Sequence, residues 1–279
     1  MAEVLGITGV TGAVGGAVVR RLAGAGQRLV LLARRPEAAP TVPGARLRRT
    51  DYADTTEVRE SLDGIDVLLM VSASEDVDRR AQHLAFVDAA AAAGVRHVVY
   101  TSFQGAAPDC TFTLGRDHWA TEEAIRASGM GFTFLRDSFY ADFLPLMATD
   151  GAIRGPAGDG RVAAVARDDV AAVAAAVLTD PSAHAGATYD LTGPEALTLA
   201  EAAAVIAEVT GTPTRYLEET VPEAYASRAS YGAPDWQVDA WVSTYTAIAR
   251  GEVAEVSDVV ERLTGHPATS LRELLTRSR

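Results

Sequence analysis

The chain has 279 residues, of which 48% are hydrophobic and 22% are charged, and its formal net charge is −12. This composition is typical of a globular protein with a full core, and the length allows one large domain or a main domain with a smaller one. The acidic balance excludes a general attraction to nucleic acid or to an anionic membrane surface. We therefore expect neither nucleic acid nor a membrane among its partners.

Two residue types narrow the chemistry further. Cys110 is the single cysteine, which excludes an internal disulfide framework and metal sites built on paired cysteines. The histidines show no metal-ligand spacing, so no metal is expected. All 25 basic residues are arginines, which excludes any mechanism that needs a lysine. The start of the chain does not resemble a signal sequence and no apolar segment is long enough to span a bilayer, so we expect a cytoplasmic protein.

The first half of the chain alternates short apolar runs with helical patterns. The apolar runs predict six buried strands, at residues 4–8, 28–33, 45–51, 66–72, 96–102 and 131–137. The helical patterns lie between them, at residues 13–26, 55–62, 79–94 and 116–129. Continuous apolar runs fit strands buried on both faces, and their alternation with helices predicts an α/β fold with a doubly wound parallel sheet of the Rossmann type.

After about residue 138 this alternation ends. We predict a helix near 168–179, a strand at 187–193 and a short strand at 214–218. Thr198, with Glu201 three residues later, is a capping-box pattern that opens another helix. Residues 222–279 are predicted to be mostly helical. We therefore predict a Rossmann domain at 1–150, on which the helix near 168–179 packs, and a smaller, mostly helical substrate domain at 151–279.

The stretch "GITGVTGAVGG", residues 6–16, follows the first strand and opens the first helix. In this context glycines permit a tight turn, the close approach of a pyrophosphate and close packing of helix on strand. The helix N-terminus adds free N–H donors for the phosphates. The motif predicts a dinucleotide cradle formed by Gly9, Thr11, Gly12, Ala13, Val14 and Gly15. A plain strand-to-helix turn is the alternative interpretation.

The end of the second strand indicates which dinucleotide binds. An acidic residue there would bind the ribose 2′-hydroxyl of NAD, but this chain has Arg34 and Arg35. A guanidinium suits a 2′-phosphate in charge and in geometry, so we expect NADP(H). The alternative is a solvated arginine pair. Asp51, at the end of the third strand, either accepts from the adenine amino group or caps the next helix.

Polar residues also follow the later strands. Ser72, Ser102 and Ser138 lie just past three strand ends, and Ser74 and Phe139 follow closely. Ligands of an open parallel sheet bind beyond the carboxyl ends of its strands. These residues are therefore candidates for contacts with the cofactor.

The chain lacks the residue pair with which many Rossmann-type dehydrogenases carry out catalysis. A standard short-chain dehydrogenase pairs a tyrosine with a lysine four residues later, which is impossible in a chain without lysine. His118 is the best candidate for a proton donor, and Glu122 lies one turn further along the same helix face. The alternative, equally favoured, is that His118 only packs and forms hydrogen bonds. Tyr140 either donates to a substrate carbonyl or packs. Three phenylalanines form either a flat apolar slot or part of the core: Phe103, Phe139 and Phe143.

Several segments resemble the NmrA-like atypical short-chain dehydrogenases, and within them the quinone oxidoreductase 2 and triphenylmethane reductase group. They run over nearly the whole chain and include "TGVTGAVG", "LLARRP", "AAAAGVRHVVYTS" and, most specific, "HWATEEAIRASGMGFTFLRDSFYADF". The resemblance implies NADPH binding and hydride transfer to a flat, conjugated small molecule. It also implies cofactor contacts from Gly9–Gly15, Arg34, Ser72–Ala73–Ser74, Asp137–Tyr140 and Gly155–Arg161. The family often has Asn where this chain has Asp137, which puts that contact in doubt.

Three functions remain open on the sequence. An NADPH-dependent reductase of quinones or similar acceptors is favoured, because the His-x-x-Thr-Glu helix is retained. The alternatives are a non-catalytic, NADP(H)-sensing regulator and a substrate-specific reductase or isomerase of secondary metabolism. A homodimer is also left open.

Overall fold

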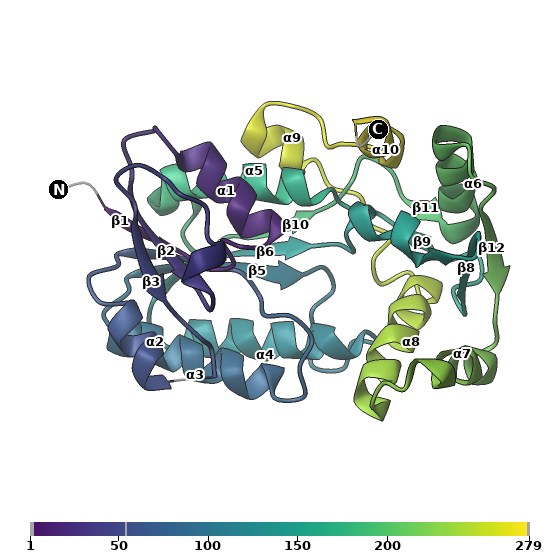
Figure 1. The fold of residues 1–279 in the computed structure, drawn as a ribbon, viewed down its shortest axis with the longest axis horizontal. Helices are drawn as coiled ribbons and strands as arrows, with labels where there is room; N and C mark the ends of the chain where they lie inside the picture. The colour runs from purple at the N-terminus through teal and green to yellow at the C-terminus, as the bar shows by residue number, and fades with distance from the viewer. Residues whose placement is uncertain (1–2, 54, 278–279) are drawn as a thin grey trace. The chain divides into compact units, whose positions relative to one another are not determined.

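A seven-stranded sheet organises the first half of the chain in the computed structural model, which describes residues 3–53 and 55–277 (Figure 1). The strand order is β10-β6-β5-β4-β1-β2-β3, and the pairings of β1, β2, β3, β4 and β5 are parallel. The strands are β1 (Val4–Ile7), β2 (Arg28–Ala33), β3 (Arg46–Arg49), β4 (Val67–Met70), β5 (His97–Phe103), β6 (Gly131–Asp137) and β10 (Thr188–Leu191). All six strands predicted in this half are present, but β3 is mostly exposed rather than buried, because it lies at the edge of the sheet.

Helices cover both faces of this sheet. Figure 1 shows α1 and α5 on one face and α2, α3 and α4 on the other. Their bounds are α1 (Ala13–Leu22), α2 (Thr55–Ser61), α3 (Arg79–Ala92), α4 (Thr113–Ala127) and α5 (Arg167–Thr179). The predicted doubly wound Rossmann-type fold is therefore confirmed.

The central strands are apolar because both of their faces are covered. Every residue of β4 and β5 is buried, and Phe86 on α3 packs into the same core as Tyr100 on β5. The helix α4 begins at Thr113, earlier than the predicted start at residue 116. The Thr113 N–H donates to Ser243 Oγ at 3.1 Å, so a distant side chain caps this extra turn.

The later part of the chain forms small sheets and helices. A three-stranded sheet has the order β12-β8-β7, and β11 pairs with β9. The strands are β7 (Ala148–Thr149), β8 (Ala152–Gly155), β9 (Arg161–Val162), β11 (Leu197–Thr198) and β12 (Arg215–Glu218), and the helices are α6 (Leu199–Thr210), α7 (Val221–Arg228), α8 (Asp235–Ala249), α9 (Val259–Thr264) and α10 (Leu271–Arg277). The capping box of Thr198 and Glu201 is confirmed at α6.

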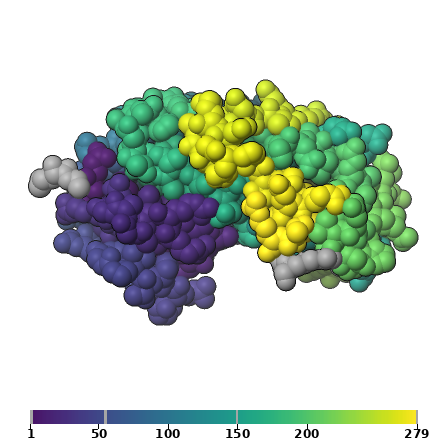
Figure 2. Space-filling model, turned by 90° about the horizontal axis from the view of Figure 1, so that it is seen from above, coloured from purple at the N-terminus to yellow at the C-terminus, as the bar shows by residue number. Residues whose placement is uncertain are grey.

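Five short 3-10 helices complete the described elements. They are η1 (Pro36–Ala38), η2 (Ala141–Phe143), η3 (Pro145–Met147), η4 (Pro181–His184) and η5 (Ala229–Tyr231). Figure 2 shows α10, in yellow, beside α6, in green, where Arg272 and Glu208 form an ion pair at 2.6 Å. None of the helices among the described residues is long and apolar enough to cross a membrane.

The chain divides into two compact units that are interleaved in sequence. The first comprises Met1–Ser102, Asp117–Arg136 and Val170–Tyr189, and the second comprises Phe103–Arg116, Asp137–Asp169 and Asp190–Arg279. The domain boundary at residue 150 stays a prediction.

Candidate active site

The glycine loop is shaped by close backbone contacts. Gly9 has a φ of +63°, which side chains other than glycine rarely adopt. The Gly12 N–H donates to Gly9 O at 2.8 Å and closes the turn. A Cβ at Gly15 would lie 2.6 Å from Thr8 O and would also overlap the carbonyl of Gly9. The first turn of α1 can therefore lie directly on the loop backbone only because residue 15 has no side chain.

The N-terminus of α1 is open to an anion. Gly12 is the N-cap and has no side chain to satisfy the first N–H groups, and the first turn holds no acidic residue. Thr11, Gly12 and Ala13 are exposed at this end, whereas Val14 and Gly15 are buried. Unsatisfied N–H donors and the positive end of the helix dipole favour a phosphate at this position.

The end of β2 presents the two arginines at the sheet edge where the cradle lies. The strands β1 and β2 are parallel neighbours, with Ile7 opposite Leu31. Arg34 and Arg35 are exposed, and the guanidinium of neither forms a hydrogen bond or an ion pair within the described part of the chain. Their guanidinium donors are therefore available to a ligand.

Asp51 is half-buried after β3. Its carboxylate accepts from the Ala53 N–H at 3.2 Å, so it closes a local turn ahead of α2. This contact resembles the capping role left open above, and a contact with adenine stays a prediction.

The loop after β4 is held by side chains from other elements. The Ser72 N–H donates to Thr101 Oγ1 at 2.9 Å, and the Ala73 N–H donates to His83 Nε2 at 3.0 Å. Arg79 Nε donates to Ala73 O at 3.0 Å. Ser74 is exposed. The backbone of this loop is therefore fixed while its outer end faces solvent.

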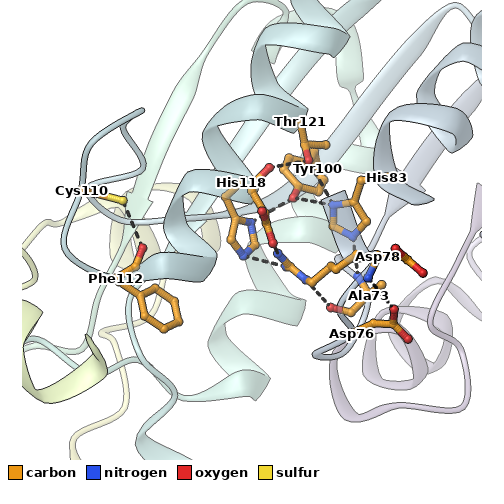
Figure 3. Close-up of polar contacts among 11 residues, drawn as sticks. Ala73, Asp76, Asp78, His83, Tyr100, Cys110, Phe112, His118 and Thr121 are labelled. Carbon is orange, nitrogen blue, oxygen red and sulfur yellow. Dashed lines mark hydrogen bonds and ion pairs between the residues drawn. The ribbon is translucent and has the colours of Figure 1, made fainter. Parts of the chain in front are cut away.

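His118 lies in a buried polar network on α4 (Figure 3). Its Nε2 is 3.0 Å from Arg79 Nη2, and its Nδ1 is 2.9 Å from Tyr100 Oη. A guanidinium can only donate, so Nε2 accepts and the neutral ring carries its proton on Nδ1. Burial, followed by the charge of Arg79, holds the pKa of His118 well below its ordinary value. These contacts favour the packing interpretation, and a role as proton donor stays a prediction.

Glu122 forms contacts that the helical spacing did not indicate. Its fully buried carboxylate accepts from Arg136 Nε at 2.8 Å and Arg136 Nη2 at 2.7 Å, a two-point contact. Ser102 Oγ donates to it at 2.6 Å, and Arg126 Nη2 lies 3.2 Å away. Glu122 thus orients the hydroxyl of Ser102, one of the predicted cofactor-binding residues.

The segment after β6 combines an acid and a phenol. The Tyr140 hydroxyl donates to the buried Asp137 carboxylate; burial, and next this carboxylate, raise the pKa of Tyr140 well above its ordinary value. The phenol therefore keeps its proton at neutral pH. Ser138 is also buried, and its Oγ has no hydrogen-bond partner within residues 3–53 and 55–277.

Three aromatic rings cluster in the second unit. The ring centroids of Phe103, Phe112 and Phe139 lie 4.7, 4.9 and 5.1 Å apart in pairs. Phe143 instead lies 6.0 Å from Tyr140 and carries the Arg167 guanidinium over its ring. The structure thus groups two of the three phenylalanines predicted for a slot and adds Phe112. Cys110 is buried beside this cluster, with Sγ donating to Phe112 O at 3.3 Å.

The Gly155–Arg161 loop has structural contacts of its own. A Cβ at Gly155 would overlap the Tyr245 ring, and one at Gly160 would overlap Ile248 O, so both glycines allow α8 to approach. Arg161 pairs with Glu201 at 2.9 Å. An approach of this loop to the cofactor stays a prediction.

No motif in the sequence indicated the network residues Arg79, His83, Tyr100 and Thr101. One local signal was present, because Arg79 and His83 are four residues apart and so share a face of α3 directly after the loop they hold. No group of three or more His, Cys, Asp or Glu side chains that could hold a metal occurs among the described residues.

The cradle, the strand order and the free arginine pair define a dinucleotide-binding protein of the Rossmann class. The family described as NAD(P)H-binding matches residues 9–181. The chain therefore belongs to the NAD(P)H-binding family.

Relatives that match over nearly the whole chain indicate which kind of NAD(P)H-binding protein this is. Quinone oxidoreductase 2 of Escherichia coli is 32% identical over 277 residues, which covers 96% of both chains. The (4-alkanoyl-5-oxo-2,5-dihydrofuran-3-yl)methyl phosphate reductase of Streptomyces griseus is 38% identical over 277 residues, covering 96% of this chain and 95% of the relative. This chain is an NAD(P)H-dependent oxidoreductase, as the resemblance implied.

Solved structures agree with this assignment. The E. coli quinone oxidoreductase in complex with NADPH matches with a TM-score of 0.88 at 31% identity, covering 98% of this chain and 99% of that one. The Citrobacter sp. triphenylmethane reductase in complex with NADP(H) matches with a TM-score of 0.85 at 31% identity, covering 99% and 100%. The regulator NmrA, at 15% identity and a TM-score of 0.78, shares the fold alone. The predicted family is confirmed, and with it the binding of NAD(P)H.

Proposed function

We propose that this protein is an NADPH-dependent reductase that delivers hydride to a quinone or a similarly conjugated small molecule without a Tyr/Lys pair. The observation that carries the proposal is the open N-terminus of α1 next to two arginines whose donors are free of contacts with other described residues. The likeness to reductases of conjugated compounds along the whole chain supports the same acceptor class.

The cofactor would be held by three sets of groups at the carboxyl edge of the sheet. The N–H of the exposed Ala13, at the start of α1, suits the pyrophosphate, since no side chain caps the helix and the first turn holds no acidic residue. Arg34 and Arg35 suit the 2′-phosphate. The loop from Ser72 to Ser74, the oriented hydroxyl of Ser102 and the buried Ser138 Oγ are proposed as further contacts. When bound, NADPH supplies the hydride through its nicotinamide ring.

Aromatic residues and Tyr140 are proposed to receive the acceptor. Phe103 is buried in a hydrophobic core cluster, against which Phe112 and Phe139 pack half-buried, and the latter two rings are proposed to offer aromatic faces to a flat acceptor. Tyr140 is proposed as the hydrogen-bond donor to the acceptor oxygen: its phenol stays protonated, and its single O–H would turn from Asp137 to the acceptor. Reduction of a quinone takes one hydride and one proton, and water can supply the proton once the ring is positioned. His118 is proposed as a buried positioning residue, because both of its ring nitrogens are engaged.

The direct test is stopped-flow mixing of the protein and NADPH with a panel of quinones and conjugated dyes. We expect loss of the NADPH absorbance in proportion to the acceptor reduced, saturable in both substrates. Tight NADPH binding without oxidation by any acceptor would contradict the reductase and favour an NADP(H)-sensing regulator.

A second candidate is a reductase specific for one conjugated furanone phosphate. It is favoured by the 38% identity to the Streptomyces griseus enzyme, whose name gives such a compound as its substrate. Adding a furanone phosphate to the same panel separates the two proposals. A kcat/KM for that compound more than about a hundredfold above every quinone, a transition-state difference of about 2.7 kcal/mol, would favour the specific reductase. A cytoplasmic location and a homodimer stay predictions.

A further inference from the structure

We infer that Arg79 and His83 clamp the Ala73 peptide and thereby position the loop after β4 for the nicotinamide half of the cofactor. Neither residue would touch the cofactor, so both are positioning residues. The inference rests on the proposed placement of NADPH on the sheet edge.

His83 and Arg79 hold both backbone polar groups of one residue, the N–H and the C=O of Ala73. His83 Nε2 accepts from the Ala73 N–H at 3.0 Å, and Arg79 Nε donates to Ala73 O at 3.0 Å. The two side chains lie four residues apart on α3, so they reach the loop from one helix face. Both are buried, and Figure 3 shows His83 directed at Ala73. The backbone of Ala73 is therefore fixed by two side chains of a rigid helix.

The strand order indicates which half of the cofactor this loop meets. The cradle follows β1 at the middle of the sheet, and Arg34 follows β2 on one side of it. If Arg34 binds the 2′-phosphate, the adenosine half lies over β2 and β3. The other half must then extend across the switch point, over β4 and β5. The loop of Ser72, Ala73 and Ser74 follows β4, on this nicotinamide side.

The clamp is built into a larger buried network that fixes its donors and acceptors. Arg79 also donates to His118 Nε2 at 3.0 Å and pairs with Asp117 at 3.3 Å, while only 4% of its side chain is exposed. Burying a guanidinium is costly, and the contacts with Ala73 O and His118 are to neutral acceptors. An apolar side chain would fill the same space without that cost. The arrangement fits a requirement for position rather than for stability alone.

The protonation of His83 follows from the same contacts. Because its Nε2 accepts from the Ala73 N–H, the proton lies on Nδ1, which faces Thr121 Oγ1 at 3.1 Å. Burial, followed by the charge of Arg79, lowers the pKa of His83 to about 3. The acceptor for Ala73 is therefore present throughout the neutral pH range.

Titration calorimetry with two probes tests the inference on the full chain. NADPH spans both halves of the site, whereas adenosine 2′,5′-bisphosphate carries the adenosine half alone. For His83→Leu and for Arg79→Met we expect NADPH to bind at least about tenfold more weakly, the loss of one well-placed hydrogen bond. The affinity for the bisphosphate should stay within about twofold, below the effect of one such bond.

Two further variants distinguish a positioning role of His83 from a role in the stability of the fold. His83→Gln places an amide oxygen near the former Nε2, so it should restore NADPH affinity to within about threefold of the wild type. His97→Leu removes another buried histidine, at the first residue of β5 and so at the opposite end of that strand from the proposed site, and should change neither affinity.

Each outcome bears on one proposal. Equal weakening of both probes, or unchanged NADPH binding in His83→Leu and Arg79→Met, would overturn the clamp and leave the reductase proposal intact. If His83→Leu does not fold, an Arg79→Met protein that binds NADPH as tightly as the wild type overturns the clamp by itself. A wild type that binds neither probe would overturn the proposed cofactor site, and with it this inference.

Discussion

The arginines at the end of β2 and the arginine beneath the loop after β4 use the same donor group in opposite ways. Arg34 and Arg35 are exposed, and their guanidinium groups have no hydrogen-bond or ion-pair partner among the described residues. Arg79 is buried and divides its donors among Ala73 O, His118 and Asp117. A guanidinium with satisfied donors can hold a backbone in place, whereas one with free donors can bind an anion.

This contrast matters because the chain contains no lysine. Arginine must therefore serve both as ligand-binding cation and as structural fork. The surroundings decide between these roles, since burial commits the donors to protein acceptors and exposure leaves them to a ligand.

The largest loss of cofactor affinity is expected when a side chain fills the glycine cradle. In Gly15→Ala the new Cβ would meet Thr8 O and Gly9 O, so α1 must move away from the loop. We expect NADPH affinity to fall by more than about a hundredfold, because backbone donors are displaced from the pyrophosphate. Calorimetric titration measures this. Gly24→Asn is the control, since Gly24 also has a positive φ but lies in open space after α1. Similar losses in both variants would contradict the role of the cradle.

The arginine pair itself should have the next largest effect. Arg34→Ala should weaken NADPH binding by about tenfold to a hundredfold, the range for a charge-assisted hydrogen bond, and should leave NADH binding unchanged. Fluorescence titration with both cofactors measures the ratio. Arg46→Ala removes another exposed arginine, at the start of β3, and should change neither value. A loss that is equal for NADPH and NADH would place the 2′-phosphate elsewhere.

The buried network that contains Arg79 and His83 predicts that the stability of the fold depends on pH. The folded state lowers the pKa of His83 from 6.5 to about 3, so its stabilising contribution is complete above pH 6.5 and is lost as the pH falls towards 3. Over this range the free energy of unfolding should fall by about 1.4 kcal/mol per pH unit for this residue. Urea unfolding should show a shallower pH dependence in His83→Gln than in the wild type. Identical slopes would indicate that His83 is not held neutral.

The smallest predicted effect concerns Asp137. Asp137→Asn removes the carboxylate that accepts from Tyr140, which should lower the pKa of Tyr140 and make its phenol a better donor. We expect kcat to rise by about twofold to fivefold, less than the value of a full hydrogen bond. In the Tyr140→Phe background the same substitution should have no effect, because the two groups act as one pair. Additive effects in this cycle would show that Asp137 does not act through Tyr140.

Much of the fold follows from local pattern. The bounds of β6, Gly131–Asp137, agree with the predicted strand, and the Thr198 capping box opens α6 as expected. The strands β7, β8, β9 and β11 were missed because they have two to four residues each. Segments this short show no period that indicates a strand, and some of their partners lie far away in sequence, as where Arg215 pairs with Ala152.

Only part of the candidate site could likewise be predicted from the sequence. The glycine loop and Arg34 are adjacent to strand ends, so a motif and a position predict them. The network does not follow from local pattern, because Arg79 contacts His118 across 39 positions and His83 contacts Thr121 across 38. These pairs form only because α3 and α4 cover the same face of the sheet (Figure 1). Helical spacing likewise allowed Glu122 to orient His118, but the buried carboxylate instead takes the fork of Arg136.

The central claim is that free arginines beside an open helix N-terminus make this chain an NADPH-dependent reductase. It is tested most directly by steady-state reduction of 1,4-naphthoquinone with NADPH and with NADH. We predict oxidation of NADPH in step with quinone reduction, with kcat/KM at least about tenfold higher than for NADH, as one charge-assisted contact would give. Equal use of both cofactors, or no oxidation of bound NADPH, would contradict the account.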